Sequence, residues 1–221
     1  MKKKIIALAL VLCLAAVAVV GGTLAYFTDD DDVTNTFTMG NVAISLDEAK
    51  VERPEGEDVW EPTDERVKEN EYEDVYPGAV LPKDPTVHNE GTYGAYVRAK
   101  VIVNFNALAG LQESGKLFAN GVDDSDLTAI VDVDTENWTF EAMEFSTEDP
   151  TALIYSYRYN TELAAGADTT PLFTEVTIPA FVSNEVVTKY GLGNFQIKVI
   201  AEAIQADGFA DAAAAWAAFS A

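Results

Sequence analysis

Residues 95–105, AYVRAKVIVNF, carry the clearest structural pattern in this chain of 221 residues. Every second side chain is apolar, from Ala95 to Phe105, whereas the alternate positions include Arg98 and Lys100. A period of two places the apolar side chains on one face of a β-strand and the charged ones on the other. A strand with one buried and one solvated face is typical of an antiparallel sandwich.

Similar strand-like patterns recur along the chain, at residues 36–46, 81–89, 138–145, 153–160 and 195–203. Turn signals separate them, notably Pro77-Gly78 and Asn89-Glu90-Gly91. No alternation of strands with long helices is present, so the sequence predicts an all-β fold, an antiparallel β-sandwich. Short helices are expected in loops, at residues 108–118 and 126–131, and at the alanine-rich C-terminus, residues 209–219.

Three tyrosines, Tyr155, Tyr157 and Tyr159, fall on one face of the strand predicted at residues 153–160. They could form a binding stripe on the surface. Aromatic pairs between neighbouring strands explain the same spacing more simply, because such pairs stabilise sheets. The second interpretation is therefore preferred.

Residues 47–76 differ sharply in composition from their surroundings. They are dense in Asp and Glu, include Pro54 and Pro62, and contain few aliphatic side chains. Such a segment buries too little apolar surface to offset the entropy of ordering it. It is predicted to be a long acidic loop within the domain, with Trp60 as the one large residue that would dock onto the core.

The N-terminus has the composition of an export signal. Lys2 to Lys4 precede an uncharged apolar run at residues 5–20 and small residues at 21–25. Cleavage is predicted after Ala25 or after Tyr26, which makes residues 1–25 the signal and residues 26–221 a single domain. The apolar run is shorter than the roughly 20 residues of a membrane span. Counted as far as Phe27 it approaches that length, so an uncleaved anchor stays open as the only membrane association.

Signal removal would change the formal net charge from −23 to −26 and would also remove Cys13, the single cysteine. A protein this acidic is a poor partner for nucleic acid or anionic lipid. The run Asp29 to Asp32 lacks the alternating ligands and glycine turn of a calcium loop. No metal ligand or cofactor is predicted.

Catalytic residues are not predicted either. His88 is the only histidine, which excludes a His-Glu-x-x-His zinc site. No serine lies in a Gly-x-Ser-x-Gly turn, and the predicted mature chain has no thiol. His88 is expected to be an ordinary strand or loop residue.

Residues 23–48, TLAYFTDDDDVTNTFTMGNVAISLDE, join the export signal to the first predicted strand. The order Tyr26-Phe27, Thr28-Asp29, Phe37-Thr38 and Gly40-Asn41-Val42 resembles the start of the TasA/camelysin family. These are surface and biofilm-matrix proteins of Gram-positive bacteria. Later blocks, from Pro77-Gly78 to Tyr96-Val97-Arg98, are similar too. The resemblance implies a jelly-roll topology, export through a SipW-type signal peptidase, and a location in the extracellular matrix or on the cell surface.

The resemblance also implies a function, a secreted structural protein that self-associates into fibres. In such fibres the N-terminal segment of one subunit adds as a strand to the next subunit. The candidate donor strand here spans about Phe27 to Leu46, and its apolar residues are Phe27, Phe37, Val42, Ile44 and Leu46. Two alternatives stay open, a camelysin-type surface metallopeptidase and a monomeric adhesin or accessory subunit. No catalytic residue can be transferred from the family to this sequence.

Overall fold

The computed structural model describes residues 41–104, 127, 130–149, 152–178, 180, 185, 188 and 196–219. These residues belong to a single unit of the chain, Gly40–Ala221. The predicted export signal, its cleavage site, the acidic run at 29–32 and the helix expected at 108–118 lie outside the described residues.

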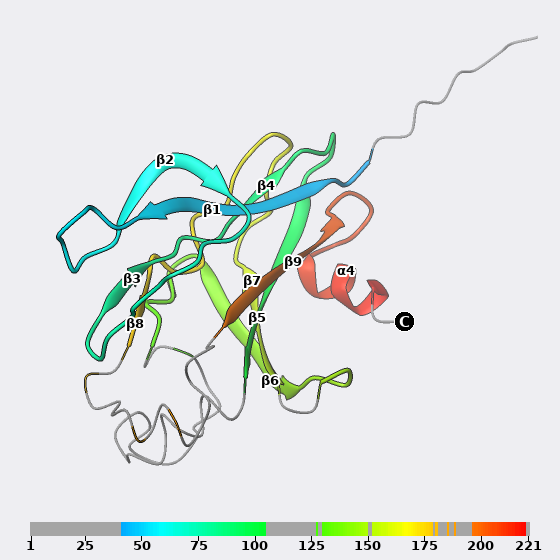
Figure 1. The fold of residues 1–221 in the computed structure, drawn as a ribbon. Helices are drawn as coiled ribbons and strands as arrows, with labels where there is room; N and C mark the ends of the chain where they lie inside the picture. Colours follow the sequence, from blue (N-terminus) through cyan, green and yellow to red (C-terminus); the bar gives the residue numbers. More distant parts are fainter. Residues whose placement is uncertain are drawn as a thin grey trace, which may run out of the picture. The chain divides into compact units, whose positions relative to one another are not determined.

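Within these residues the secondary structure is almost entirely β (Figure 1). The strands are β1 (Ile44–Glu52), β2 (Glu61–Val67), β3 (Val80–Pro82), β4 (Thr86–Asn89), β5 (Ala95–Asn104), β6 (Trp138–Phe145), β7 (Ala152–Tyr159), β8 (Glu175–Thr177) and β9 (Ile197–Gln205), and the helix is α4 (Ala212–Phe219). They form three sheets with strand orders β2-β1-β4, β3-β8 and β6-β7-β5-β9. Every strand pair is antiparallel, which confirms the predicted fold class.

β5, formed by the alternating residues from Ala95 onward, is one of the two inner strands of the larger sheet. β5 pairs with β7 on one side and with β9 on the other. Its five apolar positions from Ala95 to Val103 are at most 1% exposed, as the alternation predicts. The sequence did not reveal the partners, because β4 precedes β5 closely yet pairs with β1 in the other large sheet.

The turn after β4 therefore carries the chain from one sheet to the other. Gly91 is required in this turn, because a Cβ at that position would lie 2.6 Å from the carbonyl oxygen of Asn41. The N–H of Thr92 donates to the same oxygen at 3.1 Å. The turn thus also holds the residues that lead into β1.

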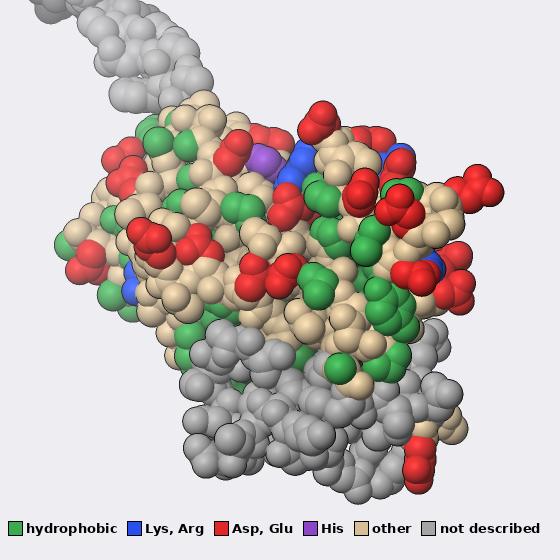
Figure 2. Space-filling model, turned by 90° about the vertical axis from the view of Figure 1, so that its left-hand side faces the viewer, with side chains coloured by type: hydrophobic (Ala, Val, Ile, Leu, Met, Phe, Trp, Pro, Cys, Tyr) green, Lys and Arg blue, Asp and Glu red, His purple; other side chains and the backbone are tan. Residues whose placement is uncertain are grey.

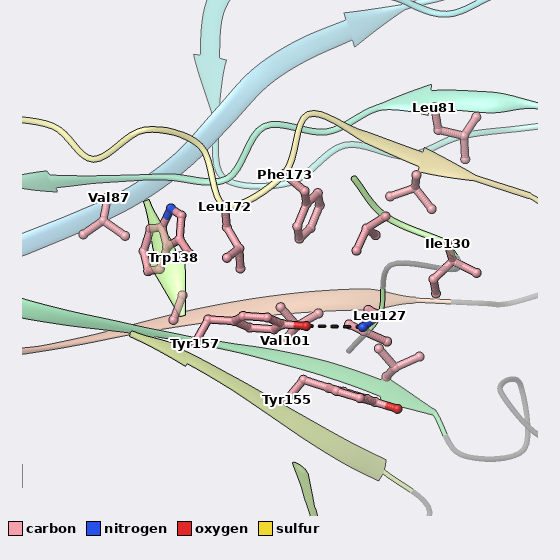
Figure 3. Close-up of a cluster of buried hydrophobic side chains, with 14 of the residues drawn as sticks. Leu81, Val87, Val101, Leu127, Ile130, Trp138, Tyr155, Tyr157, Leu172 and Phe173 are labelled. Carbon is pink, nitrogen blue, oxygen red and sulfur yellow. Dashed lines mark hydrogen bonds between the residues drawn. The ribbon is translucent and has the colours of Figure 1, made fainter. Parts of the chain in front are cut away.

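The core lies between the sheets and includes residues from most strands (Figure 3). Leu172 and Phe173 point into it from the segment before β8, toward Tyr157 on β7. Tyr157 also meets Phe140 edge-on, with ring centroids 5.6 Å apart, and Tyr159 meets Trp138 in the same way at 5.0 Å. The preferred interpretation as cross-strand aromatic pairs is confirmed for Tyr157 and Tyr159, whereas Tyr155 lies opposite Met143.

The prediction of a long acidic loop at residues 47–76 is wrong. β1 continues to Glu52, and β2 returns antiparallel to it from Glu61 to Val67. Composition misled here because β2 is an edge strand, whose many carboxylates reach solvent while the backbone pairs with β1. Trp60 does dock as expected, with 7% of its surface exposed.

The C-terminal helix forms where the alanine-rich segment predicted it, as α4. Its N-terminus is capped by Asp211, whose Oδ1 accepts the N–H of Ala214 at 2.8 Å. Trp216 is buried, and the guanidinium of Arg98 lies 4.2 Å from the centroid of its ring. No helix among the described residues has the length and apolar character needed to cross a membrane.

Candidate functional site

The structure places part of the predicted donor strand inside the subunit. Ile44 and Leu46 lie in β1, where they pair with Asn89 and Val87 of the same chain and pack against the core. Val42 lies just before β1 and is partly exposed. Phe27 and Phe37, like the cleavage residues Ala25 and Tyr26, lie outside the described residues.

Strand β9 is an open edge of the larger sheet, since β5 is its only partner strand within the described part of the chain. Its core-facing side chains are partly exposed, in contrast to those of β5, which are fully buried. These core-facing residues are Ile197, Val199, Ala201 and Ala203. The apolar face of the sheet is therefore incompletely covered along β9.

Two other edge strands have features that hinder pairing with another chain. β2 contains Pro62 and an irregular register with β1, and β6 has a bulge at Glu141. Proline, bulges and charges are the usual protection of an edge. β9 pairs with β5 in an unbroken register and contains only two charged residues, Lys198 and Glu202. Of these three edges, β9 is the least protected.

His88 is the centre of a polar network on β4. Its Nδ1 lies 2.7 Å from Oδ1 of Asp168, and its Nε2 lies 2.9 Å from Oδ1 of Asp47. Arg66 on β2 binds the same Asp47 oxygen at 2.8 Å and also pairs with Asp84. Figure 2 shows the histidine in purple at the surface, beside a basic side chain and carboxylates. The network ties β1, β2 and β4 to the loop that carries Asp168.

This network sets the ionisation of its members. Partial burial alone would lower the pKa of His88, but hydrogen bonds to Asp47 and Asp168 outweigh it and raise the pKa above the usual 6.5. For Asp47, burial alone would raise the pKa of the carboxyl, yet hydrogen bonds from His88 and Arg66 lower it. Both pKa shifts favour the charged forms, a protonated His88 beside an ionised Asp47.

The network predicts a pH dependence of stability. A histidine with a raised pKa stabilises the fold fully below about pH 6.5, and this contribution is lost as the pH rises through the folded-state pKa. Paired with partly exposed carboxylates, it contributes on the order of 1 kcal/mol. Urea unfolding should show that the free energy of unfolding falls between pH 5.5 and pH 8. The fall should be larger for the wild type than for His88→Gln, which has no titrating group at this position.

The comparison between the two proteins is needed because general repulsion in so acidic a chain also grows with pH. That repulsion acts on both proteins alike. An equal loss in the two would contradict a stabilising role for protonated His88.

The His88 network does not fit a metal centre. Its two ring nitrogens face different carboxylates, so one ion could not bind His88, Asp47 and Asp168 together without breaking both hydrogen bonds. Across the described residues no group of three His, Cys, Asp or Glu side chains is placed to hold a metal ion.

A second polar cluster lies deeper, on the core side of β1. Glu48 is 3% exposed and contacts both Lys83 and Asn70. Sequence reasoning missed it, because Glu48 and Asn70 fall in the segment predicted to be a loop. One signal was available, since Glu48 continues the alternation of Ile44 and Leu46 and so belongs to the face that points inward.

Comparison with known protein families finds a match to the N-terminal part of the chain. The model of a family described as camelysin metallo-endopeptidase matches residues 1–103, from the predicted export signal into β5. No curated protein and no solved structure matches the chain. The match agrees with the resemblance found in residues 23–48. Residues 1–103 are thus similar to the camelysin family, which supports the resemblance to TasA/camelysin surface and biofilm-matrix proteins over the N-terminal part of the chain.

Proposed function

We propose that this protein is an exported structural subunit that assembles into extracellular fibres by donating its N-terminal segment to a neighbouring subunit. A SipW-type signal peptidase would cleave after Ala25 or Tyr26 and so free the segment. Because Ile44 and Leu46 pair within their own chain, the donated part is the segment before Asn41. Phe27 and Phe37 are the large apolar residues that it would insert.

The open edge of β9 is the observation that carries the proposal. A strand added there would continue the sheet beyond β9 and would cover the partly exposed apolar face. The donor is also attached at a suitable place. Asn41 is held to Thr92, a few residues before Ala95, which pairs with Gln205 at the end of β9.

The length of the donor is sufficient. Residues 27–40 would span about 45 Å if fully extended, whereas a nine-residue strand such as β9 spans roughly 30 Å. Several residues would remain to bridge two subunits.

Deletion of residues 26–40 from the mature protein is expected to abolish fibres. The deletion removes the proposed donor but leaves every described residue in place, so the subunit should keep its β-rich circular dichroism. Electron microscopy and sedimentation velocity of purified protein measure the outcome. A matched variant, Phe27→Ser with Phe37→Ser, keeps the length and charge of the segment and should fail in the same way. Fibres formed by the deletion variant would contradict strand donation.

The same experiments separate the alternatives. A wild-type protein that sediments as a monomer at every concentration would be an adhesin or accessory subunit. The description of the matched family as a metallo-endopeptidase favours a test of peptidase activity as well. Cleavage of casein by the purified protein, abolished by a chelator, would establish that activity and would call for ligands outside the residues described above.

A further inference from the structure

Glu48, Lys83 and Asn70 form a compact chemical group. The Glu48 carboxylate lies between the other two, with Oε2 bound to Nζ of Lys83 and Oε1 accepting a hydrogen bond from Nδ2 of Asn70 at 3.0 Å. The Lys83 side chain is only 15% exposed and that of Glu48 only 5%. An amine and a carboxamide thus meet at a single buried carboxylate.

The orientation of the Asn70 amide is fixed by its other hydrogen bonds. Nδ2 also donates to the carbonyl oxygen of Ala49 at 2.8 Å, and Oδ1 accepts the N–H of Val51 at 2.8 Å. The N–H of Val51 therefore polarises the side-chain carbonyl. The amide nitrogen faces the Glu48 carboxylate, where a proton can be delivered to it.

The group lies beside the core, because Tyr72 is close enough for the charge of Glu48 to act on it. Tyr72 and Trp60 pack together, with ring centroids 6.4 Å apart, and Leu81 belongs to the same core. Burial, together with the negative charges of Glu48 and Asp84, raises the pKa of Tyr72 far above its usual range. The Lys83 amine and the Glu48 carboxylate are in direct contact and largely shielded from solvent, so a proton can pass between them along their hydrogen bond.

We propose that these three residues form an intramolecular amide bond between Nζ of Lys83 and Cγ of Asn70, with Glu48 as the catalytic residue. Glu48 first takes a proton from the Lys83 ammonium. The neutral amine attacks Cγ of Asn70, and the N–H of Val51 stabilises the oxyanion. Glu48 then gives this proton to the departing amide nitrogen and takes the second proton from the attacking Nζ, which the released ammonia finally carries away as ammonium. The C–N bond to Nδ2 breaks, the bond to Nζ forms, and ammonia leaves, with no oxidant or reductant required.

The bond would join two segments that noncovalent contacts hold together. Asn70 follows β2 and Lys83 follows β3, so the link would close a covalent loop through residues 70–83. A loop closed in this way restricts the unfolded chain, as a disulfide does. The mature protein, which is predicted to contain no cysteine, would thereby gain a cross-link.

A second lysine–carboxylate pair serves as an internal control. Lys100 binds Glu202 at 2.6 Å, and both side chains are partly buried. The other oxygen of Glu202 has no hydrogen-bond partner, whereas the second oxygen of Glu48 holds an asparagine amide. Lys100 should therefore remain a free amine.

Mass spectrometry of the full-length protein, purified after export, tests the proposal. The intact mass, counted from the sequenced N-terminus, should be one ammonia lower than the encoded mass. Tandem spectra of proteolytic fragments should join Lys83 to Asn70 and leave Lys100 free. Glu48→Gln should have the encoded mass because the base is lost. Lys83→Arg should also have the encoded mass, although its guanidinium can still pair with Glu48. Asn70→Asp should lose one water in place of ammonia.

Wild-type protein with the encoded mass, and with Lys83 and Asn70 in separate fragments, would overturn the proposal. Glu48 and Lys83 would then be a buried ion pair, and Asn70 would only hydrogen-bond the backbone of β1. This result would not affect the fibre proposal, which electron microscopy tests independently. A linked fragment in the Glu48→Gln variant would overturn the role given to Glu48.

Discussion

Replacing Trp138 by alanine is expected to destabilise the fold by about 3–5 kcal/mol, because it empties one of the largest buried volumes of the core. Trp138 is 1% exposed at the start of β6. Its ring meets Tyr159 edge-on, and its Nε1 donates to the carbonyl oxygen of Thr170 at 3.2 Å. The variant loses the packing and the aromatic pair, and it leaves the partly buried carbonyl of Thr170 without this donor.

Urea unfolding, followed by tryptophan fluorescence and circular dichroism, measures the loss. Phe145→Ala is the matched control, since Phe145 ends the same strand and is 54% exposed. This substitution should lower the free energy of unfolding by only about 1 kcal/mol, because Phe145 buries less apolar surface on folding than Trp138 does. A similar loss in both variants would contradict the placement of Trp138 in the core.

Much of the fold could be predicted because alternation is a local signal. β6 was predicted from Trp138 to Phe145 and has those bounds in the structure. β5 was predicted with the correct buried face for the same reason. Strand partners are set by contacts between distant segments. The pairing of β4 with β1 could therefore not be predicted from the residues of either strand alone.

The acidic segment shows where composition fails as a guide. A long acidic loop was predicted because carboxylates outnumber apolar residues at 47–76. A strand at the edge of a sheet needs few buried side chains, however, since its backbone hydrogen bonds and a few anchors hold it. Trp60, directly before β2, provides such an anchor, and cross-strand ion pairs such as Lys50 with Glu65 use the charges.

The polar clusters were beyond sequence reasoning for a related physical reason. Asp168 is 80 residues from His88, and Lys83 is 35 residues from Glu48. In a chain with 37 acidic residues, the types of residue alone could not single out these carboxylates. The fold selects them by carrying β1 past both β4 and the residues that follow β3.

Replacing Ile44 by aspartate is expected to destabilise the folded subunit itself, by roughly 3–5 kcal/mol. Ile44 begins β1, pairs with Asn89 of the same chain and packs against the core. The substitution removes apolar burial and places a carboxylate at the margin of that core. Since a domain of this size has a stability of about 5–15 kcal/mol, the variant should melt at a much lower temperature.

The neighbouring residue provides a control for the added charge. Ser45 points to the other face, where its Oγ donates to Glu90 at 2.7 Å. Ser45→Lys should therefore keep the melting temperature and fibre formation, because the new ammonium lies beside a carboxylate at the surface. Thermal melting by circular dichroism and electron microscopy are measured on both variants. If Ile44→Asp kept the wild-type melting temperature but formed no fibres, Ile44 would act in a neighbouring subunit, and the donated strand would extend into β1. Normal melting together with normal fibres would exclude both roles, because an apolar contact of Ile44, within the subunit or between subunits, cannot accept a carboxylate without cost.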